Sequence, residues 1–309
     1  MMKSFKKMVA LSSVLLSVFV LAACGNQKSA KNYTPKELNV QFVPSSNATT
    51  MEAKAKPLEK LLKKQLGIPV HVSVSTDYNT IVEAMGSKKV DVGFLPPDAY
   101  TLSHKEYNTK VLLQALRFNY IEPNDVFGTH LQNHYYAQIL VRKNSGIKSL
   151  KDLKGKKIAV QDTTSAAGWV YPVVALKEHG ININKDGIQT VQVKGHDQAV
   201  LSVYNKDTDA AFVFQGARNL VKKDAPDVMS KVVPIYTTAG IPNDTITVRG
   251  DMSSKWQKKI AAAFKAIIKT KQGHEIMSTV YAHQGYKDSK DSDFNQLRKY
   301  EKIAESLNK

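Results

Sequence analysis

The feature that most constrains the fold is a repeated alternation of short strand-like segments with helix-like ones. Residues 38–43 (LNVQFV) alternate and are partly β-branched, as is typical of a strand. Residues 50–66 place leucines at helical spacing and end before Gly67, which predicts a helix closed by a glycine C-cap. The rest of this first series is a predicted strand at 70–75, a helix at 78–86, and strands at 90–95, 111–116 and 137–142.

A second series with the same alternation begins at residue 157. Its predicted strands are 157–161, 188–193, 209–213, 231–235 and 245–248, and its predicted helices are 165–179, 196–204, 215–223, 253–270, 274–281 and 292–307. Such short steps predict α/β units with parallel sheets. No repeat of about 20–50 residues recurs, which excludes a solenoid.

The alternation is interrupted near residues 133–136 and again near 236–242, and a chain of 309 residues is long enough for two domains. We therefore expect two α/β lobes with a ligand in the cleft between them. Sheets of this kind bind ligands at the carboxyl ends of their strands, where helix N-termini point inward.

The first 24 residues have the pattern of an export signal. Residues 1–7 carry three lysines and no acid, residues 9–23 are apolar or small, and the only cysteine follows as Cys24. This order predicts a secretory signal over 1–23. Leu-Ala-Ala-Cys resembles the bacterial lipobox, in which the cysteine is lipidated; an ordinary secretory signal with an incidental cysteine is the alternative. The lipobox predicts that Cys24 carries a lipid anchor on the outer face of the cell membrane. Residues 24–36 are polar without an apolar pattern, so we expect them to form a flexible linker behind the anchor.

The lone cysteine and the charge exclude several classes of protein. One cysteine rules out an internal disulfide and any zinc site with two or more cysteines. The 44 Lys and Arg against 27 Asp and Glu give a formal charge of +17. For an exported and tethered chain, we expect this charge to face anionic lipid headgroups and wall polymers. Nucleic acid is the alternative partner, but no long lysine run, RNA-binding aromatic motif or zinc finger is present.

Five segments carry a resemblance to a known family. They are 75–78 (STDY) with 81–85 (IVEAM) and 90–92 (VDV), then 135–141 (YYAQILV), then 149–157 (SLKDLKGKK) with 162–169 (DTTSAAGW), then 195–197 (GHD) with 199–200 (AV), and last 241–244 (IPND). In this order and spacing they resemble the solute-binding component of phosphonate, phosphate and phosphite ABC importers.

The resemblance implies a two-lobed fold of the type II periplasmic-binding-protein kind, with two chain crossovers as its hinge. Lobe one would comprise 37–133 and 237–309, and lobe two 134–236. The resemblance also implies that the protein is not an enzyme and needs no cofactor. It would capture a small oxyanion by lobe closure and deliver it to a membrane permease fuelled by an ATPase.

The segment 162–168 is the expected anion cradle of lobe two. It lies between a predicted strand and a predicted helix, so its backbone N–H groups are unpaired and point toward the cleft. The helix dipole and the hydroxyls of Thr163, Thr164 and Ser165 add to this attraction, although these residues alternatively only cap the helix. The family usually has Ser-Thr-Ser-Gly here. This chain has Ser165-Ala166-Ala167-Gly168, so two hydroxyl donors are lost while the amides of Ala166 and Ala167 remain.

Further site residues follow from the resemblance. Tyr78 and Tyr135 match family tyrosines that donate to the bound oxygens, with simple packing as the alternative. His196 begins a helix and, if protonated, is a cationic donor; a neutral helix cap is the alternative. Asp244 matches a carboxylate that faces the amine of aminoalkyl phosphonates. The second family acid is missing near Gln215, which favours a neutral or anionic tail on the ligand.

Other functions compete with this interpretation. An enzyme is disfavoured because the chain has no G-x-S-x-G elbow and no G-x-x-x-x-G-K-[ST] loop. A metal carrier would use His130 and His134, four residues apart, but these lie in a polar connection and capture needs three or four converging ligands, so no metal is expected. A surface adhesin on the same scaffold predicts no pocket with convergent donors. Another small metabolite remains open as the ligand.

Overall fold

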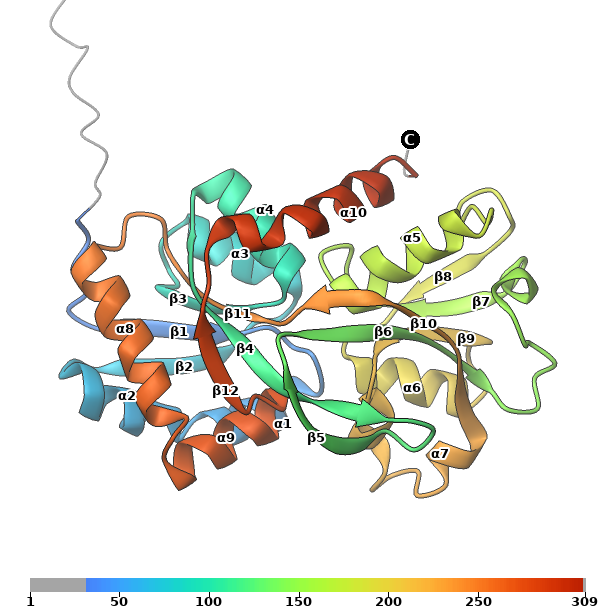
Figure 1. The fold of residues 1–309 in the computed structure, drawn as a ribbon, viewed down its shortest axis with the longest axis horizontal. Helices are drawn as coiled ribbons and strands as arrows, with labels where there is room; N and C mark the ends of the chain where they lie inside the picture. Colours follow the sequence, from blue (N-terminus) through green and yellow to red (C-terminus); the bar gives the residue numbers. More distant parts are fainter. Residues whose placement is uncertain (1–31, 308–309) are drawn as a thin grey trace, which may run out of the picture.

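The protein folds into two α/β lobes that lie side by side (Figure 1). The computed structural model describes residues 32–307. The first lobe is built on a seven-stranded sheet of order β12-β4-β11-β3-β1-β2, with β5 paired to β4 outside this path. Its strands are β1 (Leu38–Phe42), β2 (Val70–Val74), β3 (Val92–Leu95), β4 (Lys110–Ile121), β5 (Val126–Gln132), β11 (Thr245–Val248) and β12 (Gly285–Asp288).

The second lobe is built on a five-stranded sheet of order β10-β6-β9-β7-β8. Its strands are β6 (His134–Arg142), β7 (Lys157–Val160), β8 (Gln189–Gln192), β9 (Ala210–Phe214) and β10 (Val232–Pro242). Both sheets are mixed, and not purely parallel as the alternation predicts. In lobe one, β11 pairs antiparallel with β3 and β4, and in lobe two, β6 pairs antiparallel with β9 and β10.

Helices cover both sheets. They are α1 (Ala48–Ala55), α2 (Leu58–Leu66), α3 (Tyr78–Gly86), α4 (Pro97–Tyr107), α5 (Tyr171–Glu178), α6 (His196–Tyr204), α7 (Val228–Lys231), α8 (Ser254–Ile267), α9 (Lys271–Tyr281) and α10 (Asn295–Glu305), with short turns η1 (Leu150–Leu153), η2 (Ala166–Val170), η3 (Ala217–Val221) and η4 (Asp291–Phe294). Across residues 32–307, none of these helices combines the length and apolar content needed to span a bilayer.

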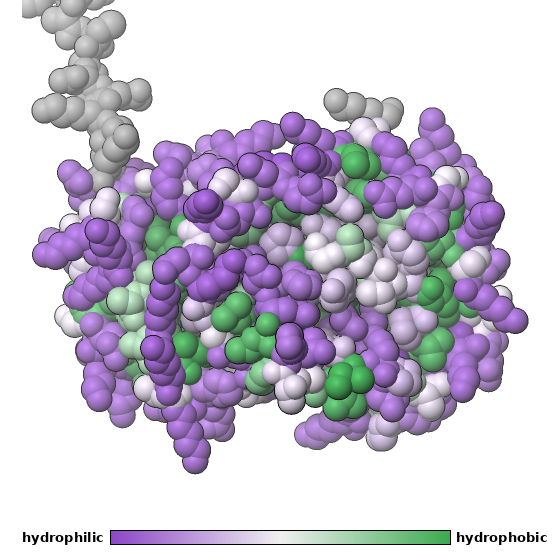
Figure 2. Space-filling model, viewed as in Figure 1, coloured by the Kyte–Doolittle hydropathy of each residue, from purple (hydrophilic) through white to green (hydrophobic). Residues whose placement is uncertain are grey.

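Apolar side chains fill the interior of each lobe. In lobe one, Phe42 of β1 stacks on Phe94 of β3 with ring centroids 4.1 Å apart, and both are fully buried. The leucines at 58, 62 and 66 form the buried face of α2, and each fully buried leucine stabilises the fold by about 1.5–3 kcal/mol. The face of the molecule shown in Figure 2 is mainly hydrophilic, with apolar residues in small groups.

Two chain crossings connect the lobes and lie next to each other. Strands β6 and β10 pair antiparallel up to Pro242 opposite His134, at the point where both enter lobe one. The buried amide of Asn243 then donates to the carbonyls of Ala115 and Gln132, each at 3.0 Å. One side chain thus ties together the segments that pass between the lobes.

The C-terminal helix also reaches across the lobe boundary. Figure 1 shows α10 extending from lobe one toward α5 of lobe two. Tyr300 of α10 stacks on Tyr171 of α5 with centroids 4.6 Å apart, and Lys177 of α5 donates to Ser306 at 2.9 Å. The two lobes are therefore also in contact through α10 and α5.

Several predicted elements differ from those observed. The predicted helix at 50–66 is two helices, because Pro57 lacks the amide hydrogen that would continue α1. The predicted helix at 165–179 begins with the wide turn η2 before α5. The strand at 231–235 continues as β10 through the predicted break to Pro242. The polar connection that holds His130 is not a loop but strand β5, which forms a hairpin with β4.

The N-terminal predictions fall almost entirely outside the described residues. The signal over 1–23, the lipidated Cys24 and the linker as far as residue 31 are not described. Within the predicted linker, Tyr33 donates its backbone N–H to Asp251 at 2.9 Å, and the guanidinium of Arg249 lies 3.8 Å from the centre of its ring. The predicted linker therefore contacts the folded body at Tyr33.

Candidate ligand-binding site

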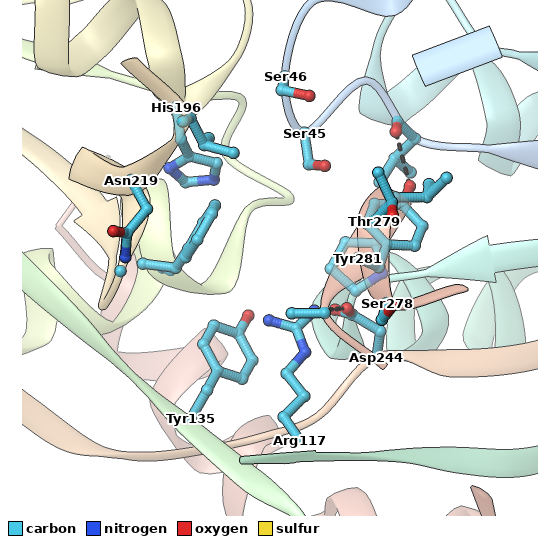
Figure 3. Close-up of a pocket in the computed structure, with 18 of the residues that line it drawn as sticks. Ser45, Ser46, Arg117, Tyr135, His196, Asn219, Asp244, Ser278, Thr279 and Tyr281 are labelled. Carbon is cyan, nitrogen blue, oxygen red and sulfur yellow. Dashed lines mark hydrogen bonds and ion pairs between the residues drawn. The ribbon is translucent and has the colours of Figure 1, made fainter. Parts of the chain in front are cut away.

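A cavity of about 190 Å³ lies between the two lobes (Figure 3). Lobe one contributes Val43, Ser45, Ser46, Tyr78, Pro96, Arg117, Tyr120, Phe127, Asp244 and the segment from Ser278 to Ala282, and lobe two contributes Tyr135, Ser165, Ala167, His196, Phe214, Gly216, Asn219 and Leu220. Pockets for drug-sized ligands are typically about 300–1,000 Å³. A volume below that range favours a small ligand.

The start of η2 forms one wall of this cavity. Ser165 is buried, and its hydroxyl accepts a hydrogen bond from the Gly168 amide at 3.1 Å. Its backbone carbonyl accepts from Trp169 at 2.9 Å and from Val170 at 3.2 Å, as expected at the start of a helical turn. The amide of Ala167 lies one residue into this turn, where an N–H has no preceding turn to donate to. Ser165 and Ala167 both line the cavity, so this part of the predicted cradle faces the cleft.

Glycine is required at position 168 by a close approach. A Cβ at Gly168 would lie 2.2 Å from Cγ of Gln161, far inside van der Waals contact. Gln161 is itself fixed, because its side-chain amide donates to Gly195 O at 3.2 Å and accepts from Gly195 N at 3.1 Å. The residue before α6 and the start of η2 are therefore held against one another.

Two tyrosines reach the cavity from different lobes. Tyr78 is the first residue of α3, which is capped by Asp77 through a bond from the Thr80 amide at 2.7 Å. Tyr135 lies near the start of β6. Burial raises the pKa of both phenols, and the negative charge of Asp244 adds to the effect. Both hydroxyls therefore stay protonated and can donate to an acceptor in the cavity.

An arginine and a carboxylate meet at the base of the cavity. Arg117 lies near the end of β4, and Figure 3 shows its guanidinium between Tyr135 and Asp244. It donates through a terminal nitrogen to Oδ2 of Asp244 and lies 5.2 Å from the centre of the Tyr135 ring. Burial acts to raise the pKa of Asp244, but the charge of Arg117 and a hydrogen bond from His283 outweigh it, so the pKa falls below its ordinary value.

His283 also contacts the carboxylate of Asp244. Its Nε2 lies 3.3 Å from Oδ2 of Asp244, and its Nδ1 lies 3.1 Å from the hydroxyl of Tyr286. Burial lowers the pKa of His283, which is fully buried. A neutral ring with its proton on Nε2 satisfies both contacts, since it donates to Asp244 and accepts from Tyr286.

His196 begins α6 and is buried against the ring of Phe214, with centroids 4.8 Å apart. Burial lowers its pKa to about 3, and nearby Arg117 acts in the same direction while Asp244 opposes it. His196 is therefore neutral at physiological pH, which favours the predicted alternative of a neutral side chain over that of a cationic donor. Its backbone N–H donates to the carbonyl of Ser45 at 3.1 Å, which joins the two lobes across the cleft.

The structure brings together six of the ten residues predicted for the ligand: Tyr78, Tyr135, Ser165, Ala167, His196 and Asp244. The other four lie elsewhere. Thr163 and Thr164 line a neighbouring hollow beside α10, because the chain turns away from the cavity before Ser165. Ala166 is buried but is not part of the cavity wall. Gln215 donates to Glu122 at 3.0 Å, at the tip of the β4–β5 hairpin.

Sequence analysis did not find Arg117, the serines at 45 and 46, or Asn219. The predicted strand ends at residue 116, one position before the arginine. Leu113, Ala115 and Arg117 are alternate residues of one strand and all are buried. An arginine that continues the inward face of an apolar strand is the signal that could have identified it.

The family model for periplasmic substrate-binding proteins of phosphonate ABC transporters matches residues 40–294. The chain belongs to this family. It is 28% identical over 219 residues to the phosphate-import protein PhnD of Mycolicibacterium smegmatis, a match that covers 67% of this chain and 64% of that protein. It is 23% identical over 246 residues to the phosphonates-binding periplasmic protein of Escherichia coli, covering 78% of this chain and 69% of that protein.

A solved structure has the same fold. PhnD1 from Prochlorococcus marinus, in complex with methylphosphonate, superposes with a TM-score of 0.74 over 87% of this chain and 98% of that one, at 17% identity. The family is a family of transport proteins that bind substrates outside the cytoplasm for ABC importers. The type II periplasmic-binding-protein fold expected from the sequence is confirmed.

Proposed function

We propose that the protein is the extracytoplasmic binding component of an ABC importer and that it captures a small phosphonate-type oxyanion in the cavity between its lobes. The observation that carries this proposal is the composition of the cavity wall. Several donors line it: two tyrosine hydroxyls, the Ser165 hydroxyl, the Ala167 amide and the guanidinium of Arg117. An oxyanion has several acceptor oxygens and a negative charge, which such a wall satisfies.

Capture proceeds by closure of the lobes and involves no chemical step. A ligand that contacts Ser165 of lobe two and Tyr78 of lobe one at the same time favours the closed arrangement by its differential affinity for the two states. The closed form then binds the permease, and a separate ATPase supplies the energy. The protein itself acts as a binding protein rather than as an enzyme.

Calorimetric titration of the purified protein tests this function. Phosphate, phosphite, methylphosphonate and 2-aminoethylphosphonate form the panel, with sulfate and arginine as comparison ligands. We expect at least one member of the panel to bind with one-to-one stoichiometry and to raise the melting temperature. A ligand at about 100 times its Kd stabilises the native state by about 2.7 kcal/mol. Binding of arginine or a metal ion, with none of the four oxyanions, would contradict the proposal.

Membrane attachment through lipidated Cys24 completes the proposal. Its support is the sequence pattern of the first 24 residues. The full chain expressed in a bacterial host should partition into the detergent phase, and the Cys24→Ser variant should be released in soluble form. Equal partitioning of the two would favour an ordinary secretory signal.

A further inference from the structure

The charge balance of the cavity limits the ligands that it can accept. Only Arg117 and Asp244 among the lining residues carry a formal charge at neutral pH, since His196 is neutral. A ligand with an ammonium group needs a carboxylate that is free to pair with it. Asp244 is the only candidate among the lining residues.

Asp244 already has two partners. Arg117 donates to its Oδ2, and Nε2 of His283 approaches the same oxygen at 3.3 Å. The side chains of Arg117 and Asp244 are only 11% and 12% exposed, so water screens their interaction little. An ammonium group beside Asp244 would lie beside Arg117 as well. Attraction to the carboxylate would then be offset by repulsion from the guanidinium.

Not every N–H donor of Arg117 has an acceptor in the described part of the chain. Its Nε is buried and has no acceptor within the described part of the chain, and its hydrogen bond to Asp244 uses only one terminal nitrogen. The second terminal nitrogen of Arg117 can donate to a ligand oxygen in the cavity. Arg117 therefore favours ligand groups that accept hydrogen bonds and disfavours a ligand group that carries a positive charge.

Part of the remaining cavity wall is apolar. Tyr120 and Phe127 come from the β4–β5 hairpin and stack with centroids 4.8 Å apart, while Phe214, Leu220 and Val280 close the space around them. An uncharged alkyl tail can be buried against these side chains, and each methylene group that it buries is expected to raise the affinity about threefold to fourfold.

We propose that Arg117 is a specificity-determining residue that occupies Asp244 and so selects oxyanions with an uncharged, apolar tail over those with an ammonium tail. This inference rests on the proposed function. It concerns the part of the ligand that the anion cradle does not hold.

Two isosteric ligands test the inference on the unmodified protein. Propylphosphonate and 2-aminoethylphosphonate have the same length and differ in a terminal methyl against an ammonium. We expect propylphosphonate to bind at least tenfold more tightly at pH 7. Equal affinity, or tighter binding of the aminoethyl compound, would overturn the inference and leave the proposed function intact. Failure of both, together with phosphate, phosphite and methylphosphonate, would instead contradict the proposed function.

The Arg117→Gln variant supplies the causal test. It frees Asp244, and we expect the affinity ratio to shift by tenfold or more toward 2-aminoethylphosphonate. The Arg298→Gln variant is the matched control, because Arg298 lies on α10 outside this cavity, and its ratio should not change. An unchanged ratio in Arg117→Gln would overturn the inference.

A charge-conserving variant covers the case in which Arg117→Gln does not fold, as judged by circular dichroism. Arg117→Lys retains a cation beside Asp244, so it should keep the preference for propylphosphonate. Loss of that preference in a folded Arg117→Lys protein would also count against the inference.

Discussion

The most demanding prediction concerns the buried ion pair that holds the β4–β5 hairpin onto lobe two. Arg218 of η3 donates through Nε to Asp125 Oδ2 at 2.9 Å, and their side chains are 1% and 0% exposed. The same guanidinium donates to the carbonyls of Pro123 at 2.8 Å and Val232 at 3.0 Å. It therefore bonds three acceptors at once, and it also lies 3.4 Å from Oε2 of Glu122.

Replacing Arg218 with methionine keeps much of its volume but removes every one of these donors. Burial already raises the pKa of Asp125, although Arg218 acts to lower it, so the carboxylate is poorly solvated even with its partner present. Breaking a buried ion pair by removing one partner typically costs about 3–5 kcal/mol. Single domains are stable by only about 5–15 kcal/mol, so this is a large fraction of the total.

Urea unfolding followed by circular dichroism measures the effect. With an m-value of about 3 kcal/mol/M, a loss of 3–5 kcal/mol lowers the midpoint by about 1–1.7 M. The double variant Arg218→Met with Asp125→Asn removes the buried charge, so we expect it to recover at least about 1.5 kcal/mol of the loss. Lys231→Ala removes an exposed ion pair with Asp227 and should leave the midpoint unchanged. A loss below about 1 kcal/mol in Arg218→Met would refute the reasoning.

Three further predictions follow from the walls of the cavity. The pKa of His196 falls to about 3 on folding, so between pH 7 and pH 4 the unfolded chain binds a proton that the native protein does not, and the free energy of unfolding falls as the pH drops. In urea titrations at several pH values, His196→Gln should reduce the slope of the free energy of unfolding against pH by up to about 1.4 kcal/mol per pH unit. Ser165→Ala removes the cap on Gly168 and a ligand donor, so it should cost about 1 kcal/mol in stability and weaken oxyanion binding about twofold to tenfold in calorimetry, whereas unchanged affinity would exclude Ser165 as a contact. Gly216→Ala places a Cβ 2.3 Å from Cζ of Tyr120 at a φ of +96°, so it should displace that ring. We expect calorimetry to show weaker oxyanion binding, and we expect the melting temperature of the free protein to fall only slightly.

Local sequence patterns were sufficient for much of lobe two and for placing Ser165 at the start of a helical turn, but not for Thr163 and Thr164, which lie outside the cavity. The order of strand, hydroxyl residues and helix around Ser165 depends on neighbours within ten residues, and the observed η2 begins one residue later. The same is true of Tyr78, whose helix starts directly after its Asp77 cap. Such features are predictable because the backbone groups that they satisfy are close in sequence.

The base of the cavity depends on contacts that no local pattern contains. Arg117 and Asp244 are 127 positions apart, and they meet because β4 and β11 pair antiparallel. Strand β5 was missed for a related reason. Its exposed residues give it no apolar alternation, and only its pairing with β4 makes it a strand.

A crystal structure of the protein with bound methylphosphonate is the most direct test of the account as a whole. We predict that the phosphonate oxygens lie about 2.7–3.2 Å from the hydroxyl of Ser165, the amide of Ala167 and the hydroxyl of Tyr78, with the methyl group toward Phe127 and Phe214. A phosphonate bound outside the cleft, or a cleft occupied by a cationic ligand paired with Asp244, would contradict it.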